Sequence, residues 1–80
     1  MRTIHFDLGP EVEARDLDRL ARALPLVEPE DRLEITMEAA DAHQAGRVFT
    51  MLRENGFDFQ PKGSHEGLLY KVSAWRRAVH

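Results

Sequence analysis

The spacing of apolar residues changes period several times along the chain, and this limits the possible folds more than any other feature. Residues 3–8 alternate, with Ile4, Phe6 and Leu8 on one side, which predicts a strand that is covered on one face only. Gly9 and Pro10 interrupt the alternation. The chain therefore begins with a half-buried strand that ends at a turn.

A helix is predicted next, over residues 11–24, because apolar residues recur there at helical spacing. Its start is open: either Pro10 is the first helical residue, or the helix begins nearer Ala14. Pro25 is expected to end it. The predicted buried stripe is Leu17, Leu20, Ala21 and Leu24, and the predicted solvent side is Arg15, Asp18, Arg19 and Arg22.

The same alternation and helical spacing then recur. A turn over residues 26–31 leads into a strand over 33–38, and Asp41 with Gln44 resembles a capping box at the head of a second helix. Asn55 and Gly56 form a strong stop signal for that helix. Its predicted buried stripe is Ala45, Val48, Phe49 and Leu52.

The last part of the chain predicts a hairpin. Phe57 and Phe59 begin a third strand, residues 62–67 form the loop, and residues 68–75 form the fourth strand. Crossovers between parallel strands are right-handed, so both helices should cover the same face of the sheet. The prediction for residues 1–80 is one α+β domain, a two-layer sandwich of order β-α-β-α-β-β with a mixed four-stranded sheet.

The other face of this sheet should be open to solvent and is the first candidate for a partner surface. It combines polar side chains with an exposed leucine and an exposed tryptophan. The alternative is that the C-terminal tail folds over Trp75. The residues expected on this face are Thr3, His5, Asp7, Glu34, Thr36, Glu38, Leu69, Lys71, Ser73 and Trp75.

The composition excludes several classes of function. The chain has no cysteine, so it has no disulfide, no cysteine-ligated metal and no thiol nucleophile. Neither a signal peptide nor an apolar stretch long enough to cross a membrane is present, which favours a cytoplasmic location. The four histidines, at positions 5, 43, 65 and 80, lack metal-ligand spacing, and the acidic clusters lie in turns or first helical positions. No catalytic residue, metal or cofactor is therefore predicted.

Charge is distributed unevenly along the chain. The net charge is −3, yet the part after Gln60 has four basic residues and one acidic residue. Lys62, Lys71, Arg76 and Arg77 form either a basic edge for an anionic partner or the ordinary solvated surface of a hairpin. An acidic chain disfavours general nucleic-acid binding, because that affinity comes mainly from neutralising phosphates.

The element order and several landmarks resemble the TusA/SirA family of sulfur carriers. Phe6-Asp7 lies on the first strand, where the family has Leu-Asp, and residues 29–33 (Pro-Glu-Asp-Arg-Leu) lead into the second, where the family has Pro-Gly-Glu-x-Leu. Asp41, the exit at residues 55–57 and the hairpin with Tyr70 and Lys71 also fit. The resemblance covers almost the whole chain. It implies the same mixed sheet, with the last strand antiparallel.

The most specific motif of that family is missing. At the register of Cys-Pro-x-Pro the chain has Glu13-Ala14-Arg15-Asp16, so a carboxylate stands where the family carries sulfur on a thiolate. A carboxylate cannot accept sulfane sulfur. The resemblance therefore implies the fold and a site presented to partners, without sulfurtransferase activity.

Two functions are consistent with this sequence. The first is a non-catalytic protein-binding or adaptor module linked to sulfur relay, as a monomer or weak homodimer, with partner-binding residues Glu13, Arg15, Asp16, His5, Lys71 and Trp75. The second is an RNA-binding module that uses the basic edge of Lys62, Lys71, Arg76 and Arg77, with Trp75 as a stacking platform.

Overall fold

The structure is a computed structural model that describes residues 2–8, 12–38, 44–65 and 69–77, with the backbone alone at residues 63–65. Its elements are β1 (Thr3–Asp7), α1 (Ala14–Ala23), the 3-10 turn η1 (Leu24–Leu26), β2 (Arg32–Glu38), α2 (Ala45–Glu54), β3 (Phe57–His65) and β4 (Leu69–Arg76). The strands form one sheet in the order β1-β2-β4-β3. The predicted order and fold class are confirmed.

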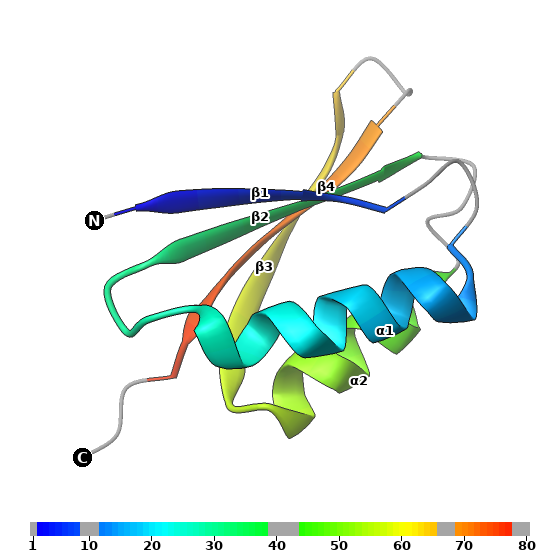
Figure 1. Ribbon diagram of the computed structural model, residues 1–80. Coiled ribbons are helices and arrows are strands. Elements are labelled where there is room, and N and C mark those ends of the chain that lie inside the picture. Colours follow the sequence, from blue (N-terminus) through cyan, green and yellow to red (C-terminus); the bar gives the residue numbers. More distant parts are fainter. Residues whose placement is uncertain (1, 9–11, 39–43, 66–68, 78–80) are drawn as a thin grey trace.

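The sheet is mixed and carries both helices on one side (Figure 1). β1 and β2 are parallel, whereas β4 runs antiparallel to both β2 and β3. The parallel pair is joined through α1 by the crossover that the sequence predicts. β1 and β3 are the two edges of the sheet.

The core lies between the sheet and the helices. On β2, Leu33, Ile35 and Met37 are at most 1% exposed, because the strand is central and these side chains face the helices. Val72 and Ala74 of β4 pair with Ile35 and Leu33 in the register and are equally buried. The helices, the chain after α1 and the start of β3 complete the core, mainly through Leu20, Leu24, Val27, Val48, Leu52 and Phe57.

Helix α1 begins at Ala14, the later of the two starts that the sequence allows. Leu20 and Leu24 of its predicted stripe are buried, whereas Leu17 and Ala21 are half-exposed. The helix ends at Ala23, and Pro25 lies within the 3-10 turn that follows. Pro25 is thus compatible with one tighter turn after the α-helical hydrogen bonds have ended.

Helix α2 follows its predicted pattern closely. Ala45, Val48 and Leu52 are buried, and Phe49 is half-buried, with its ring stacked on Phe59 at 4.5 Å between centroids. Asp41 lies outside the described residues, so the predicted capping box is not seen; Gln44 directly precedes the helix. The chain reverses at Gly56, whose φ of +79° suits glycine best.

The predicted loop over residues 62–67 is wrong in its first four positions. β3 continues to His65, with a register shift between Pro61 and Gly63. Proline and glycine suggest a turn, but on an edge strand a proline needs no hydrogen-bonding partner for its nitrogen, and a bulge absorbs the extra residue. The strand therefore bends and stays paired with β4.

Candidate functional site

The sheet face opposite the helices is a polar surface built from four strands. Register places His5 beside Glu34 and Glu34 beside Ser73, and it places Asp7 beside Thr36 and Thr36 beside Lys71. Successive side chains of a strand alternate between faces, so these residues share the face away from Leu33, Ile35 and Met37. We call this surface the open face: Thr3, His5, Asp7, Glu34, Thr36, Glu38, Leu69, Lys71, Ser73 and Trp75, with Lys62 from β3.

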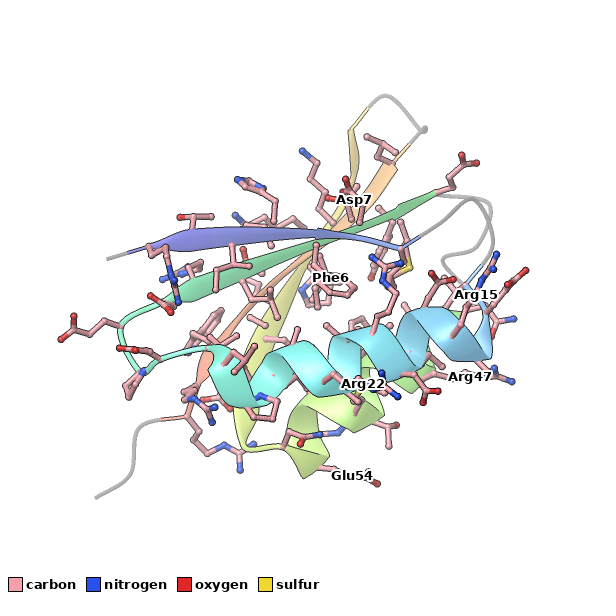
Figure 2. The ribbon with its side chains drawn as sticks, in the orientation of Figure 1. Phe6, Asp7, Arg15, Arg22, Arg47 and Glu54 are labelled. Carbon is pink, nitrogen blue, oxygen red and sulfur yellow. The ribbon has the colours of Figure 1, made fainter. Side chains whose placement is uncertain are left out.

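Figure 2 shows the division of β1 between the two sides of the sheet. Phe6 points toward the helices, and Asp7 points to the other side. Among the described residues, no segment lies over the open face, and Thr3, His5, Glu38 and Lys71 are exposed. Alternation in the sequence therefore predicted which side chains share this face, but Ser73, expected to be open to solvent, is buried.

A shallow pocket of about 410 Å³ lies near the centre of the open face. β1, β2, β3 and β4 all contribute to its lining, so its shape depends on the register of the whole sheet. Ammonium, imidazole, hydroxyl and carboxylate groups line it: Thr3, His5, Glu34, Thr36, Lys62 and Lys71.

The single carboxylate in this pocket already has partners. Ser73, which is fully buried, donates a hydrogen bond from Oγ to Oε1 of Glu34 at 2.6 Å, and Nζ of Lys62 lies 3.7 Å from the same oxygen. Among the described residues, neither His5 nor Lys71 forms an ion pair or a side-chain hydrogen bond. The pocket thus offers one ammonium group that is free to bind an anionic partner group.

The two large apolar side chains of the open face differ in exposure. Leu69 is 40% exposed, at the end of the face where β4 begins. Trp75 is half-buried, with the guanidinium of Arg32 5.0 Å from its ring centroid. The alternative that the tail covers Trp75 concerns residues 78–80, which lie outside the described residues.

The start of α1 holds the other three residues predicted to bind a partner. Glu13 is the N-cap and forms an exposed ion pair with Arg15 at 3.0 Å. Asp16 is buried and accepts hydrogen bonds from the backbone N–H of Glu13 at 3.0 Å and from Arg19 at 3.2 Å. A carboxylate in the first turn stabilises the helix through its unpaired N–H groups and its dipole. Asp16 therefore stabilises the first turn of α1.

These six residues form two groups instead of one site. Glu13, Arg15 and Asp16 belong to the helix layer, and Figure 2 shows Arg15 near the start of α1. His5 and Lys71 line the pocket of the open face, and Trp75 lies on the same face beside Arg32.

The four basic residues of the C-terminal part are also separated. Lys62 and Lys71 line the same pocket, and Arg77 pairs with Asp58 at 3.1 Å. Arg76 lies on the helix side, where its guanidinium donates hydrogen bonds to the backbone carbonyls of Val27 and Leu24 and lies 5.0 Å from the ring centroid of Phe57. Alternation could have revealed this role, because Arg76 has the parity of Ala74, a core residue.

A second hollow, of about 240 Å³, lies beside Arg76 and is lined by Leu24, Pro25, Asn55, Phe57 and Arg76. Its charged group is engaged with the main chain, as described above. Among the described side chains, no group of three His, Cys, Asp or Glu residues is placed to hold a metal ion. The helices in the described part of the chain are too short and too polar to cross a membrane.

One ion pair connects the residue before β1 to the residue before β2. Arg2 donates to Asp31 at 2.7 Å, and the backbone N–H of Glu28 donates to the same carboxylate oxygen at 3.0 Å. The hydrogen bond from Arg2, followed by that from Glu28, lowers the pKa of Asp31 below its usual value near 3.8. The carboxylate is thereby favoured in the folded state.

This lowered pKa predicts a loss of stability in acid. Because the folded state favours the charged form, the contribution of Asp31 is complete above the unfolded-state pKa and is lost as pH falls below about 4. We expect the difference in unfolding free energy between the wild type and Asp31→Asn to shrink from pH 5 to pH 3, measured by urea unfolding. The exposed neighbour provides the control, Glu30→Gln. A difference that stays constant down to pH 3 contradicts this prediction.

Comparisons of the chain with models of protein families, with curated proteins and with solved structures found no match.

Proposed function

We propose that this domain is a non-catalytic binding module for another protein, and that the open face is its recognition surface. The observation that supports this most directly is the central pocket of that face, where Lys71 lacks an ion pair among the described residues and Leu69 is exposed nearby on the same strand. A free charge beside an apolar side chain is a common arrangement in protein interfaces, where the apolar group supplies affinity and the charge supplies specificity.

The resemblance to the TusA/SirA sulfur carriers suggests which kind of protein the domain binds. The element order and the mixed sheet agree with that family, and Glu13 occupies the helix N-cap at the register of its sulfur-carrying cysteine. A chain without cysteine cannot carry the sulfur, so recognition is the function that such a scaffold retains. We therefore place the module in the cytoplasm, as a partner or regulator of a sulfur-relay assembly.

Several contacts favour a protein partner over RNA. Arg76 and Arg77 are engaged by backbone carbonyls and by Asp58, and Trp75 is partly covered by Arg32. The open face itself carries three basic side chains, Arg32, Lys62 and Lys71, of which Lys62 pairs with Glu34, in a chain with a net charge of −3. Affinity for a phosphate backbone requires a larger positive surface than this, because each neutralised phosphate adds to binding.

The proposal predicts that introducing or reversing a charge on the open face weakens partner binding. The purified chain is used to capture proteins from the cells that produce it, and each captured protein is then purified and titrated by calorimetry. Leu69→Lys and Lys71→Glu should each weaken binding by about tenfold or more, which corresponds to roughly 1.4 kcal/mol. The apolar contact is lost in the first variant, and the charge is inverted in the second.

Arg22→Glu is the matched control, because Arg22 is an exposed cation on the outer side of α1 (Figure 2). It changes the net charge as Lys71→Glu does, and it should leave the dissociation constant unchanged. Loss of binding in Glu13→Lys but not in Lys71→Glu would move the recognition surface to the start of α1. Salt-sensitive binding of single-stranded RNA, with no protein captured, would refute the proposal.

A further inference from the structure

The outer edge of β1 is an unpaired row of backbone groups. The N–H of Arg32 donates to the carbonyl of Arg2, and the N–H of Leu8 donates to the carbonyl of Thr36, so the even-numbered residues direct their backbone toward β2. Backbone groups of neighbouring residues in a strand point to opposite sides. The N–H and C=O groups of Thr3, His5 and Asp7 therefore point outward, where no segment among the described residues pairs with them.

The two edges of the sheet differ in their ability to accept another strand. On β3, Pro61 has no N–H to donate, and the register shift between Pro61 and Gly63 bends the strand. Bulges and prolines are features by which natural proteins protect edge strands. β1 is a regular strand of five residues with neither feature. It is the edge on which a further strand fits.

The apolar side chains of β1 are incompletely covered. Ile4 and Phe6 are half-buried, whereas the corresponding side chains of β2 are at most 1% exposed. Arg19 covers part of Phe6, with its guanidinium 5.1 Å from the ring centroid. A strand added at this edge would cover the remaining apolar surface of both residues.

We propose that two copies of this chain pair through β1, antiparallel to each other, around a twofold axis at His5. The sequence Thr-Ile-His-Phe-Asp is compatible with pairing to itself in this register. His5 then lies opposite His5 of the second copy, Thr3 opposite Asp7, and Ile4 opposite Phe6. This inference uses the edge of the sheet and does not depend on the partner that binds the open face.

The register satisfies both the backbone and the side chains. The outward groups of Thr3, His5 and Asp7 fall at hydrogen-bonded positions of an antiparallel ladder, which gives about six new hydrogen bonds. Ile4 and Phe6 meet at the more closely spaced positions on the helix side, and the hydroxyl of Thr3 meets the carboxylate of Asp7 on the other side. The dimer is isologous, as twofold symmetry requires.

The dimer is weak because a five-residue strand buries little surface. We expect a dissociation constant on the order of 100 μM, since about six hydrogen bonds and two apolar contacts only slightly exceed the entropic cost of association. Pairing joins the two four-stranded sheets into one, so the two open faces become a continuous surface with two pockets.

The absence of cysteine makes a disulfide test of this register possible. In His5→Cys the two introduced cysteines face each other, with Cα atoms about 5.5 Å apart, within the range that a disulfide spans. Oxidation of the two thiols by diamide, which is reduced to its hydrazine, should convert most of the protein at about 200 μM to a covalent dimer on a non-reducing gel.

Thr3→Cys is the matched control on the same strand. Position 3 lies opposite position 7, so the two introduced cysteines lie roughly 14 Å apart and cannot form a disulfide within the dimer. Gln60→Cys, on the β3 edge, controls for random collision. Equal crosslinking of His5→Cys and either control overturns the proposal.

A second variant tests the dimer without oxidation. His5→Pro removes an N–H that points away from β2, and the free side of an edge strand tolerates proline. By sedimentation at several concentrations, the wild type should increase from 9.2 kDa toward twice that mass, whereas His5→Pro stays at the monomer mass. Circular dichroism checks that this variant is folded. A wild type that remains monomeric at about 1 mM overturns the proposal.

Discussion

Replacing Phe57 by alanine is expected to remove about 3–5 kcal/mol from the free energy of unfolding. Phe57 opens β3 directly after the turn at Gly56, and it has no exposed surface. Its ring packs in the core between the sheet and the helices, and the guanidinium of Arg76 covers it from the other side. Alanine leaves a cavity there that the surrounding side chains cannot fill without moving the end of the sheet.

The expected loss is a large part of the total stability. An 80-residue domain without a disulfide is stable by roughly 4–12 kcal/mol. In urea unfolding followed by circular dichroism, the midpoint should fall by roughly 3 M, and Phe57→Ala is expected to be partly unfolded at 37 °C. Leu26→Ala is the control, since Leu26 is 73% exposed and should cost less than about 0.5 kcal/mol. A Phe57 variant within 1 kcal/mol of the wild type would contradict this account of the core.

The fold was predictable because the period of the apolar pattern agrees with the structure in almost every element. Leu33, Ile35 and Met37 alternate and are buried, and Ala45, Val48 and Leu52 have helical spacing and are buried. Asn55 and Gly56 are strong local signals, and the positive φ of Gly56 confirms the turn. The local preferences of these segments agree with the overall fold, and this agreement is what allows a fold to be predicted from the spacing of apolar residues.

The predictions failed where a local signal had two physical meanings. Pro61 and Gly63 suggest a loop in isolation, but on an edge strand they make a bulge, and whether a strand is at the edge depends on the sheet order. The sequence allows two starts for α1, because residues 11–16 contain several acids that favour a helix N-terminus. The structure has the later start, at Ala14, where the carboxylate of Asp16 accepts the N–H of the N-cap Glu13.

The candidate site was predictable as a face, but its internal contacts were not. Alternation assigned Lys71 and Ser73 to the open face, and the register brings them beside Thr36 and Glu34. Ser73 is nevertheless fully buried, and it donates a hydrogen bond to Glu34, a residue 39 positions away. Sequence patterns give the direction of a side chain, whereas the partner across the sheet follows only from the register.

Arg76 shows the same limit most clearly. Its charge and its place in the sequence group it with Lys62, Lys71 and Arg77. In the structure its guanidinium connects the end of β4 to the chain after α1, through the carbonyls of Leu24 and Val27. The carbonyl of Leu24 also accepts the N–H of Val27 within the η1 turn, so Arg76 is a second donor to that carbonyl and donates as well to the carbonyl of the C-cap Val27. The group that sequence analysis assigned to a possible RNA surface is a structural element of the fold.

Arg76→Met is therefore expected to lower the free energy of unfolding by about 2–4 kcal/mol, although it changes a residue near the C-terminal end of β4. Methionine keeps the apolar stem over Phe57, so the loss reports the two charge-assisted hydrogen bonds to the carbonyls of Leu24 and Val27. Arg77→Met is the matched control, because its pair with Asp58 is about half exposed on both sides and should contribute roughly 0–1 kcal/mol. Urea unfolding of the two variants beside the wild type measures the difference. Equal effects of the two substitutions would show that Arg76 does not connect the end of the sheet to the chain after α1.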